Sequence, residues 1–265
     1  MPQLLEVCEA AARAGGRVLR DWMGRAAVTA KGPRDLVTEA DLAAQAEIRR
    51  IVLGAFPDHG FVGEESGPGD PAAVDGRPRW IVDPLDGTTN YVKGYPAWCT
   101  SVALAEGERL LAGAIYDPLR DECFTAGRGA GARLNGAAIH VGPTERLDDA
   151  LVAVSFPAQV DAGAPAVRDF LAVLPHALAM RRSGSTALNL AAIASGRLDA
   201  FWVRRIHAWD VAAGLLLVEE AGGVVRPFAG GPPSTLERPS FIAAATPRLA
   251  HALAEVLPPA DPATW

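Results

Sequence analysis

The sequence has few cysteines, no excess of basic residues and no long apolar run. Its three cysteines, Cys8, Cys99 and Cys123, are too few and too far apart among 265 residues for a disulfide framework or a structural zinc site. With 31 acidic against 25 basic residues the net charge is -6, so no overall positive field would hold nucleic acid or an anionic membrane. No stretch approaches the roughly 18 apolar residues of a membrane span, and no signal-peptide pattern opens the chain. We therefore expect a cytoplasmic protein that binds neither nucleic acid nor membranes.

Two amphipathic helices are predicted in the first part of the chain. Apolar residues from Leu4 to Trp22 recur at steps of three and four, which indicates a helix ending near Gly24. Thr38-Glu-Ala-Asp41 has the pattern of a capping box, so a second helix should begin after Thr38. A short polar segment, 31–38, joins the two.

Short apolar runs broken by turn residues follow, and they favour strands. The runs lie at 79–82, 100–105, 110–116 and 122–125, with turns at Glu106-Gly107, Asp117-Pro118 and Asn135-Gly136. This pattern predicts an antiparallel meander over residues 79–141.

The second half of the chain alternates strand-like and helix-like runs. They lie at 150–156, 167–174, 187–194, 198–203, 211–221 and 241–245. We expect an N-terminal α+β lobe of residues 1–145, which carries most of the candidate metal ligands, and a C-terminal α/β lobe of residues 146–265, the two packed as one compact unit. The proline-rich tail from Pro258 should be loose.

Two carboxylates end a strand-like run in Trp80-Ile-Val-Asp83-Pro-Leu-Asp86-Gly-Thr-Thr-Asn90. Pro84 between them fixes the turn and leaves the Leu85 carbonyl free to point at a neighbouring site. Two carboxylates and a carbonyl are oxygen ligands of the kind that Mg²⁺ prefers. The segment is therefore a candidate cation site.

Two further acidic groups lie at chain breaks, where binding residues usually sit. Glu64 lies in Gly63-Glu-Glu-Ser66, and Asp210 follows Trp209 where an apolar helix begins. Taken one at a time, each of these acidic residues would more often be a turn former, a solvated charge or a helix cap than a cation ligand. The order and context of these residues along the chain decide between a shared cation site and separate structural roles.

In order, identity and context these motifs resemble those of the inositol monophosphatase family, magnesium-dependent, lithium-sensitive phosphatases of sugars and polyols. The resemblance rests on 63–66, 80–90, 209–214 and 220–223, with support from 35–41 and 181–186. It covers nearly the whole chain. It implies a layered αβαβα sandwich of the type shared with fructose-1,6-bisphosphatase, of class α+β or α/β, often assembled as a homodimer.

The resemblance also implies two or three Mg²⁺ ions between the lobes. One would be held by Glu64, Asp83 and the Leu85 carbonyl, and a second by Asp83, Asp86 and Asp210. Catalysis would use a water activated near Glu64 and Thr88, with Asp41 orienting Thr88. Lys31 and Asp35 are candidates for a weaker third metal or for the phosphate environment, or they are solvated loop charges.

A small phosphorylated substrate is expected in the same cleft. The predicted substrate-binding residues are Asp86, Gly87, Thr88, Gly184, Ser185, Thr186, Val203, Arg204 and Asp210. Thr88, Ser185 and Asp41 are alternatively helix caps, and two roles for one residue are compatible. Val203 stands where many inositol phosphatases of the family carry a glutamate that accepts hydrogen bonds from hydroxyls. Arg204 and Arg205 could instead bind a second anionic group.

Other phosphate chemistries fit less well. In the haloacid dehalogenase phosphatases the nucleophilic aspartate would fall at Pro84, which cannot attack phosphorus. The glycine-rich run 127–131 precedes a hairpin turn rather than a helix. We predict a Mg²⁺-dependent phosphatase, with inositol 1-phosphate as leading substrate. Histidinol phosphate, fructose 1,6-bisphosphate and a catalytically silent sugar-phosphate binder are the alternatives.

Overall fold

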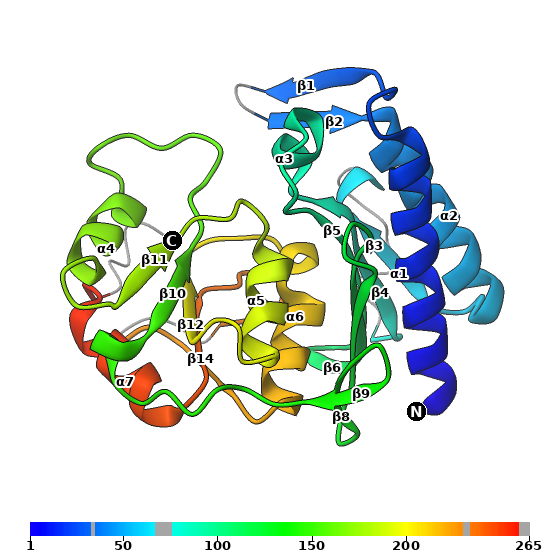
Figure 1. Cartoon of the computed structure of the whole chain (residues 1–265). Helices are drawn as coiled ribbons and strands as arrows, with labels where there is room; N and C mark the ends of the chain where they lie inside the picture. Colours follow the sequence, from blue (N-terminus) through cyan, green and yellow to red (C-terminus); the bar gives the residue numbers. More distant parts are fainter. Residues whose placement is uncertain (33–34, 67–75, 230–233, 260–265) are drawn as a thin grey trace.

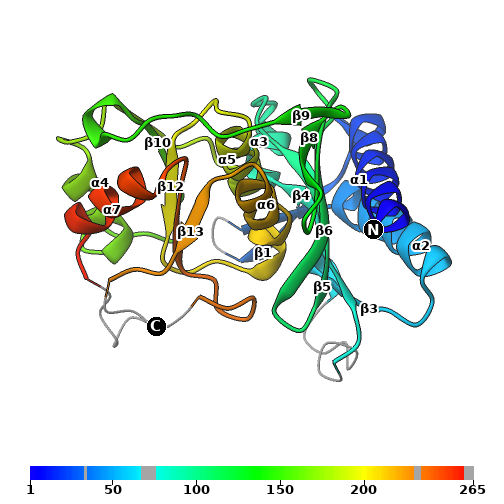
Figure 2. The ribbon, with the colours of Figure 1, turned by 90° about the horizontal axis from the view of Figure 1, so that it is seen from below.

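The secondary structure elements stack in five layers, helices against sheet against helices against sheet against helices (Figure 1). The computed structural model describes residues 1–32, 35–66, 76–229 and 234–259. The same layering is visible from below (Figure 2). The predicted αβαβα sandwich is confirmed.

The first layer consists of α1 (Pro2–Trp22) and α2 (Glu39–Ala55). The predicted capping box is present, because the Thr38 hydroxyl accepts from the Asp41 amide and the Asp41 carboxylate accepts from the Thr38 amide. The helices pack closely at Gly15, where an added Cβ would lie 2.7 Å from Ile48 Cδ1. Glycine at position 15 therefore permits the close approach of α1 to α2.

A seven-stranded sheet forms the second layer. Its strands, in spatial order, are β3 (Gly60–Gly63), β4 (Arg79–Asp86), β5 (Cys99–Glu106), β6 (Arg109–Asp117), β7 (Glu122–Gly127), β8 (Gly131–Leu134) and β9 (Ala137–Ile139). From β4 to β9 each strand pairs antiparallel with the next, as the meander prediction required, whereas β3 adds a parallel strand at the edge.

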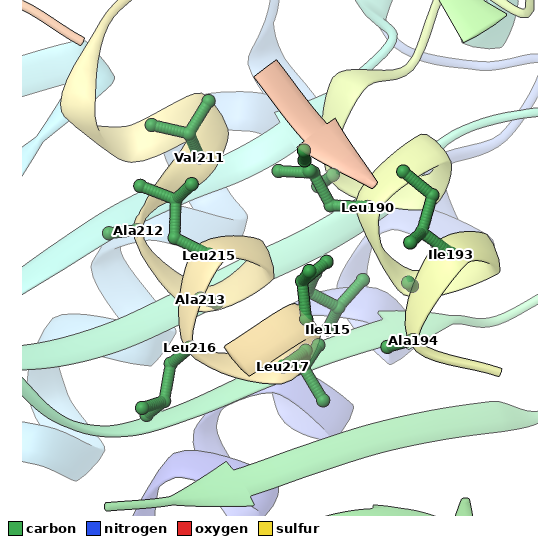
Figure 3. Packing of buried hydrophobic residues seen from close by; sticks show 14 of the residues in the cluster. Ile115, Leu190, Ile193, Ala194, Val211, Ala212, Ala213, Leu215, Leu216 and Leu217 are labelled. Carbon is green, nitrogen blue, oxygen red and sulfur yellow. The ribbon is translucent and has the colours of Figure 1, made fainter. Parts of the chain in front are cut away.

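Two almost wholly apolar helices, α5 (Thr186–Ala194) and α6 (Ala208–Glu220), fill the middle layer. A helix that is apolar all round must be buried on all sides, and these two lie between the two sheets. Figure 3 shows the packing of Leu190 and Ile193 of α5 and Leu217 of α6 near Ile115 of β6. At Gly214 an added Cβ would lie 2.5 Å from the Leu190 side chain, so glycine permits the close approach of the helices.

The second sheet has the order β11 (Ala179–Arg181), β10 (Leu151–Val154), β12 (Ala200–Val203), β14 (Phe241–Ala244) and β13 (Val224–Arg226). Its strands alternate between two cores: Phe201 and Val203 belong to the cluster around α5 and α6, and Trp202 to the cluster around α7. The outer helices α4 (Pro165–Val173) and α7 (Pro247–Val256) cover its far face.

Some elements were not predicted. The polar segment between the first two helices is a hairpin of β1 (Val28–Gly32) and β2 (Asp35–Thr38), and four of the five β1 residues are exposed, so no apolar alternation marked it. The short strands β11 and β13 were likewise not predicted. The division into lobes 1–145 and 146–265 stays a prediction, because the α5–α6 layer packs against both sheets. Residues 260–265 of the predicted loose tail lie outside the described residues.

Candidate metal and phosphate site

The site begins at a bulge in β4. Along β5 the pairing moves from Ser101 opposite Asp83 to Cys99 opposite Asp86, so three steps on β4 face two on β5. Without the extra residue Asp83 and Asp86 would point to opposite faces of the sheet, whereas the bulge places both on one face. Pro84 occupies the bulge, where its missing N–H leaves no ladder bond unmade.

The third carboxylate reaches this face from the middle layer. Asp210 is in the first turn of α6, where its carboxylate accepts from the His207 amide at 3.0 Å. The Ser101 hydroxyl, beside Asp83, donates to the Trp209 carbonyl at 3.4 Å and connects this turn to β5. As a result, one oxygen from each of Asp83, Asp86 and Asp210 lies within 4.8 Å of the others.

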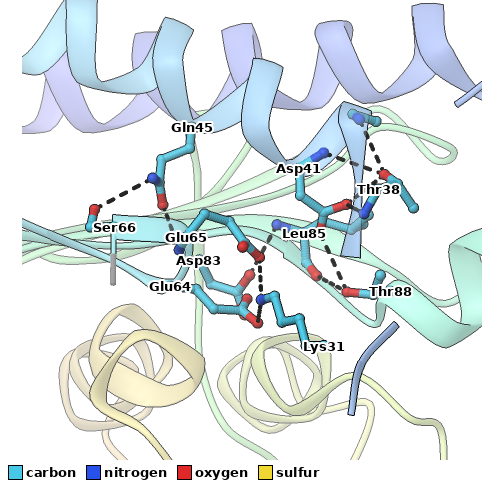
Figure 4. Close-up of polar contacts among 11 residues, drawn as sticks. Lys31, Thr38, Asp41, Gln45, Glu64, Glu65, Ser66, Asp83, Leu85 and Thr88 are labelled. Atoms are coloured by element: carbon cyan, nitrogen blue, oxygen red, sulfur yellow. Dashed lines mark hydrogen bonds and ion pairs between the residues drawn. The ribbon is translucent and has the colours of Figure 1, made fainter. Parts of the chain in front are cut away.

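Glu64 joins the group from the edge of the sheet, in a single 3-10 turn, η1 (Glu64–Ser66), that follows β3. The side chain of Gln45 on α2 fixes this turn, accepting from the Glu65 amide at 2.9 Å and donating to the Ser66 hydroxyl at 3.4 Å. The Glu64 and Asp83 carboxyls lie within hydrogen-bonding range of each other (Figure 4). Lys31 Nζ, from the β1–β2 hairpin, contacts Glu64 at 3.1 Å and Glu65 at 2.6 Å.

Burial and mutual electrostatic repulsion raise the pKa values of these four carboxyl groups. Burial raises the pKa of Asp83 well above its ordinary value, and the nearby Glu64 and Asp86 charges raise it further. Burial, with a smaller effect of Asp86, raises the pKa of Asp210 to about 8. The pKa of Glu64 and that of Asp86 are also raised, first by burial.

Two of these four acids, Asp83 and Asp86, are buried and Glu64 and Asp210 are half-buried, so all four can ionise together only if cations share the space. The donors are all oxygens, which suit a hard divalent cation. The residues therefore fit the Mg²⁺ that the sequence motifs imply.

Thr88 and Asp41 lie beside the carboxylates, as predicted. Thr88 opens the short helix α3 (Thr88–Lys93), and its hydroxyl lies 3.1 Å from the Leu85 carbonyl and 3.5 Å from Asp41 Oδ1. The Thr38 amide and hydroxyl donate to Asp41 Oδ2 at 2.9 and 2.5 Å. Asp41 is fully buried, and that burial raises its pKa to about 6. Asp41 thus closes the cap of α2 and also faces Thr88.

The Gly184-Ser185-Thr186 segment lies next to Asp86. Gly184 has φ +86 and packs on Asn90, whose side chain donates to the Ser183 carbonyl at 2.9 Å. The Ser185 hydroxyl donates to Asp86 Oδ2 at 2.6 Å, and Thr186 donates to Ser155 at 3.3 Å. The structure gives these hydroxyls protein partners, and their predicted contacts with a substrate, like those of Gly87, stay predictions.

Val203 and Arg204 lie at the end of β12 and differ in surroundings. Val203 is 6% exposed and packs in the core around α5 and α6. The Arg204 guanidinium donates to both Asp169 oxygens, at 2.5 and 2.8 Å, and stacks over the Phe228 ring. Because Asp169 is buried and needs a cation, Arg204 is directed to α4. Among the contacts of the described residues, Arg204 makes none with the carboxylates of the candidate metal site. Its predicted role in binding substrate therefore gains no support.

Sequence reasoning missed two residues of the site. Gln45 lies on α2, which was predicted from the spacing of its apolar residues, and nothing in the local sequence indicates that Gln45 belongs to the site. The Cys99 thiol lies 3.9 Å from Asp86 Oδ2 and 3.8 Å from the Ser185 hydroxyl, although the sequence suggested only a dispersed cysteine. The strand-register shift at the β4 bulge could have pointed to Cys99, because it sets this residue opposite Asp86.

Comparisons with known proteins agree with these motifs. A model of the inositol monophosphatase family matches residues 1–260. The inositol-1-monophosphatase of Rhizobium meliloti is 40% identical over 255 residues, 94% of this chain and 93% of that protein. The Nus factor SuhB of Escherichia coli K12 is 40% identical over 233 residues, 87% of this chain and 86% of that protein. A solved inositol monophosphatase from Anabaena (Nostoc) sp. PCC 7120 superposes with a TM-score of 0.83 at 34% identity, covering 100% of this chain and 99% of that one.

Proposed function

Because this chain belongs to the inositol monophosphatase family, we propose that it is a Mg²⁺-dependent phosphatase that hydrolyses a small phosphate monoester. The observation that carries the proposal is the convergence of Asp83, Asp86 and Asp210 from two layers of the fold, with one oxygen of each within 4.8 Å. A group of buried acids is unfavourable for folding unless it binds cations, so such a cluster is a feature of function rather than of stability.

Glu64, Asp83 and the Leu85 carbonyl would hold one Mg²⁺, and Asp83, Asp86 and Asp210 a second. When bound, these ions neutralise phosphate oxygens and make water more acidic. A third ion is part of the family pattern, but the side chain of its candidate ligand Asp35 lies outside the described residues.

Residues of the chain would then carry a proton away from the attacking water. Glu64 and the Thr88 hydroxyl lie on opposite sides of the Leu85 carbonyl region, and Asp41 can accept the proton that Thr88 passes on. We propose direct attack by water on phosphorus with no covalent intermediate: the new P–O bond forms as the ester P–O bond breaks, one proton of the water passes to Thr88 and Asp41, and the released alkoxide takes a proton from solvent to leave as the alcohol. Pro84 stands where the nucleophile of an aspartyl-phosphate enzyme would be, and Asp86 Oδ2 is already engaged by Ser185.

The proposed substrate is inositol 1-phosphate, as in the named Rhizobium relative, with fructose 1,6-bisphosphate and histidinol phosphate as alternatives. The test is phosphate release from these three compounds with Mg²⁺ and again with excess chelator. We expect turnover of at least one compound with Mg²⁺ and loss of that turnover in chelator. No hydrolysis of any phosphate ester would favour the silent binder, and hydrolysis that persists in chelator would contradict the metal-dependent mechanism.

The substrate preference can be tested at Val203. The side chain at position 203 is a hydrocarbon, and Val203 packs with Phe241 and the apolar residues of α6. Arg204 is held by Asp169, so a carboxylate introduced at 203 would not be neutralised by it. Val203→Glu should raise kcat/KM for inositol 1-phosphate relative to fructose 1,6-bisphosphate by about fivefold, the value of one added hydrogen bond.

Val203→Leu is the matched control for that substitution, because it changes volume without adding an acceptor. Its ratio of kcat/KM values for the two substrates should equal that of the wild type. The same ratio in Val203→Glu as in wild type would show that position 203 does not read the substrate.

The equal identity to an enzyme and to a Nus factor does not by itself choose between two functions. The carboxylate cluster favours the enzyme, because a protein that acts only by binding a partner has no need of converging, largely buried acids. A homodimer and a cytoplasmic location stay predictions. Of the helices in the described residues, none has the length and apolar character needed to cross a membrane.

A further inference from the structure

The Asp86 carboxylate is held mainly by groups that come from the middle layer. The Ser185 hydroxyl donates to Oδ2 at 2.6 Å, and the Ala187 amide donates to the same oxygen at 2.7 Å. From the sheet itself only the Cys99 thiol approaches Oδ2, at 3.9 Å, among the printed contacts of the described residues. Two donors at normal hydrogen-bond distance therefore fix this carboxylate from outside its own strand.

Ser185 has a second bond that fixes its own position. It is the N-cap of α5, and its hydroxyl oxygen accepts from the Leu188 amide at 3.3 Å. The side chain is buried, with 1% of the residue exposed. One hydroxyl thus accepts from the helix and donates to the carboxylate, so its proton has a defined direction.

The loop before Ser185 is also tied to the strand–helix turn after Asp86. Asn90 donates to the Ser183 carbonyl at 2.9 Å and to the Ala97 carbonyl at 2.6 Å. Gly184, at φ +86, allows the close contact, since an added Cβ would lie 2.9 Å from Asn90 Nδ2. The start of α5 and the Asp86–Asn90 segment are therefore one connected unit.

We propose that Ser185 is a positioning residue, whose hydroxyl orients the metal ligand Asp86 and so couples the docking of α5 on the sheet to divalent-cation affinity. The inference rests on the proposed function only in taking Asp86 as a cation ligand. It gives the Ser185 proton to Asp86, while the predicted contact of Ser185 with a substrate stays a prediction. Partners that orient a metal ligand commonly change metal affinity by about 10- to 100-fold when removed.

The test is a titration of the metal-free protein with Mn²⁺, in which isothermal titration calorimetry measures the Mn²⁺ affinity. Ser185→Ala should weaken Mn²⁺ binding by about tenfold. Ser185→Cys, which keeps the shape but is a poor donor, should weaken it similarly, and it carries the test if the alanine variant does not fold. Ser185→Thr keeps the hydroxyl and should restore binding to within about threefold of wild type.

A helix cap elsewhere supplies the control for a merely structural role. Thr246 caps α7 by accepting from the Leu249 amide at 3.2 Å, at the same spacing as Ser185 and Leu188. Thr246→Ala should lose stability as Ser185→Ala does, and its Mn²⁺ affinity should stay at the wild-type value.

The outcomes separate this inference from its premise. Equal Mn²⁺ affinity in wild type, Ser185→Ala and Ser185→Cys would overturn the positioning role and leave the proposed phosphatase intact. Weakened binding in those variants, in a protein that hydrolyses no phosphate ester, would support the positioning role and overturn the phosphatase. A wild type that binds no Mn²⁺ would overturn both.

Discussion

Replacing Asp83 with asparagine should nearly abolish phosphate release, lowering kcat/KM on the order of 10³-fold or more. Asp83 is the only acid whose carboxyl lies within hydrogen-bonding range of both Glu64 and Asp210 among the described residues, and it is 1% exposed. Asparagine keeps the volume and removes the charge that both proposed cations share. The measurement is phosphate release at saturating Mg²⁺ together with Mn²⁺ affinity.

The Asp83→Asn variant should remain folded, because losing the carboxylate charge removes electrostatic repulsion and leaves the packing of the side chain unchanged. In excess chelator, Asp83→Asn should resist urea at least as well as the wild type, since one of several mutually repelling buried acids has become neutral. Asp117→Asn is the matched control. Asp117 is also buried, but its carboxylate is paired with Arg120, so this variant should lose stability and keep its activity. Activity of Asp83→Asn within tenfold of wild type would contradict the proposed mechanism.

Much of this candidate site could be predicted because its proposed ligands are marked by local sequence. Asp83, Asp86 and the Leu85 carbonyl belong to one short segment whose proline and glycine dictate a break in the strand. The capping box at Thr38 and Asp41 is likewise a pattern of four residues, and the structure contains it as predicted. Local rules of this kind depend on backbone geometry over a few residues, which a single sequence contains in full.

Contacts between distant segments could not be predicted in the same way. Arg204 was interpreted from its neighbour Val203, but its partner is Asp169, 35 residues earlier and on another element. Ser185 was predicted as a substrate contact or a helix cap; it caps α5, and its hydroxyl also donates to Asp86, 99 residues earlier, which the sequence did not indicate. A hydroxyl or guanidinium binds whichever acceptor the packed fold brings near it, and that depends on how α4 and α5 dock on the sheets.

The β1–β2 hairpin illustrates a different limit. Four of the five residues of β1 are exposed, so burial imposes no alternation on that strand, and periodicity carried no signal there. Lys31 nevertheless reaches Glu64 and Glu65 from this hairpin. An exposed element can therefore deliver a charge to a buried site while its sequence is typical of a loop.

Removing the Thr88 hydroxyl is the second substitution with a large expected effect. Thr88→Ala should lower kcat by about 10² to 10³-fold, because a positioned proton acceptor contributes that much to catalysis. The wild-type rate should also fall as the pH drops below about 6, since Asp41, whose pKa burial raises to about 6, must be ionised to accept the proton from Thr88. In the Thr88→Ala variant no proton passes from residue 88 to Asp41. The residual rate of this variant should therefore not show the fall in rate below about pH 6.

The prediction of Thr88 as a helix cap was wrong, because Gly87 is the N-cap of α3 and the Thr88 hydroxyl faces the Leu85 carbonyl. The alternative for Thr88 and Asp41 is therefore a purely structural hydrogen-bonding role, and two variants distinguish it. Thr88→Ser keeps the hydroxyl and should retain most of the rate together with the acidic limb of the profile. Thr38→Val removes one of the two Thr38 bonds to Asp41 Oδ2 but leaves Asp41 Oδ1 facing Thr88. Because that bond favours the ionised carboxylate, its loss should move the acidic limb toward higher pH. A purely structural role would instead lower stability in Thr88→Ala and Thr38→Val while leaving both kcat and the pH profile at their wild-type values.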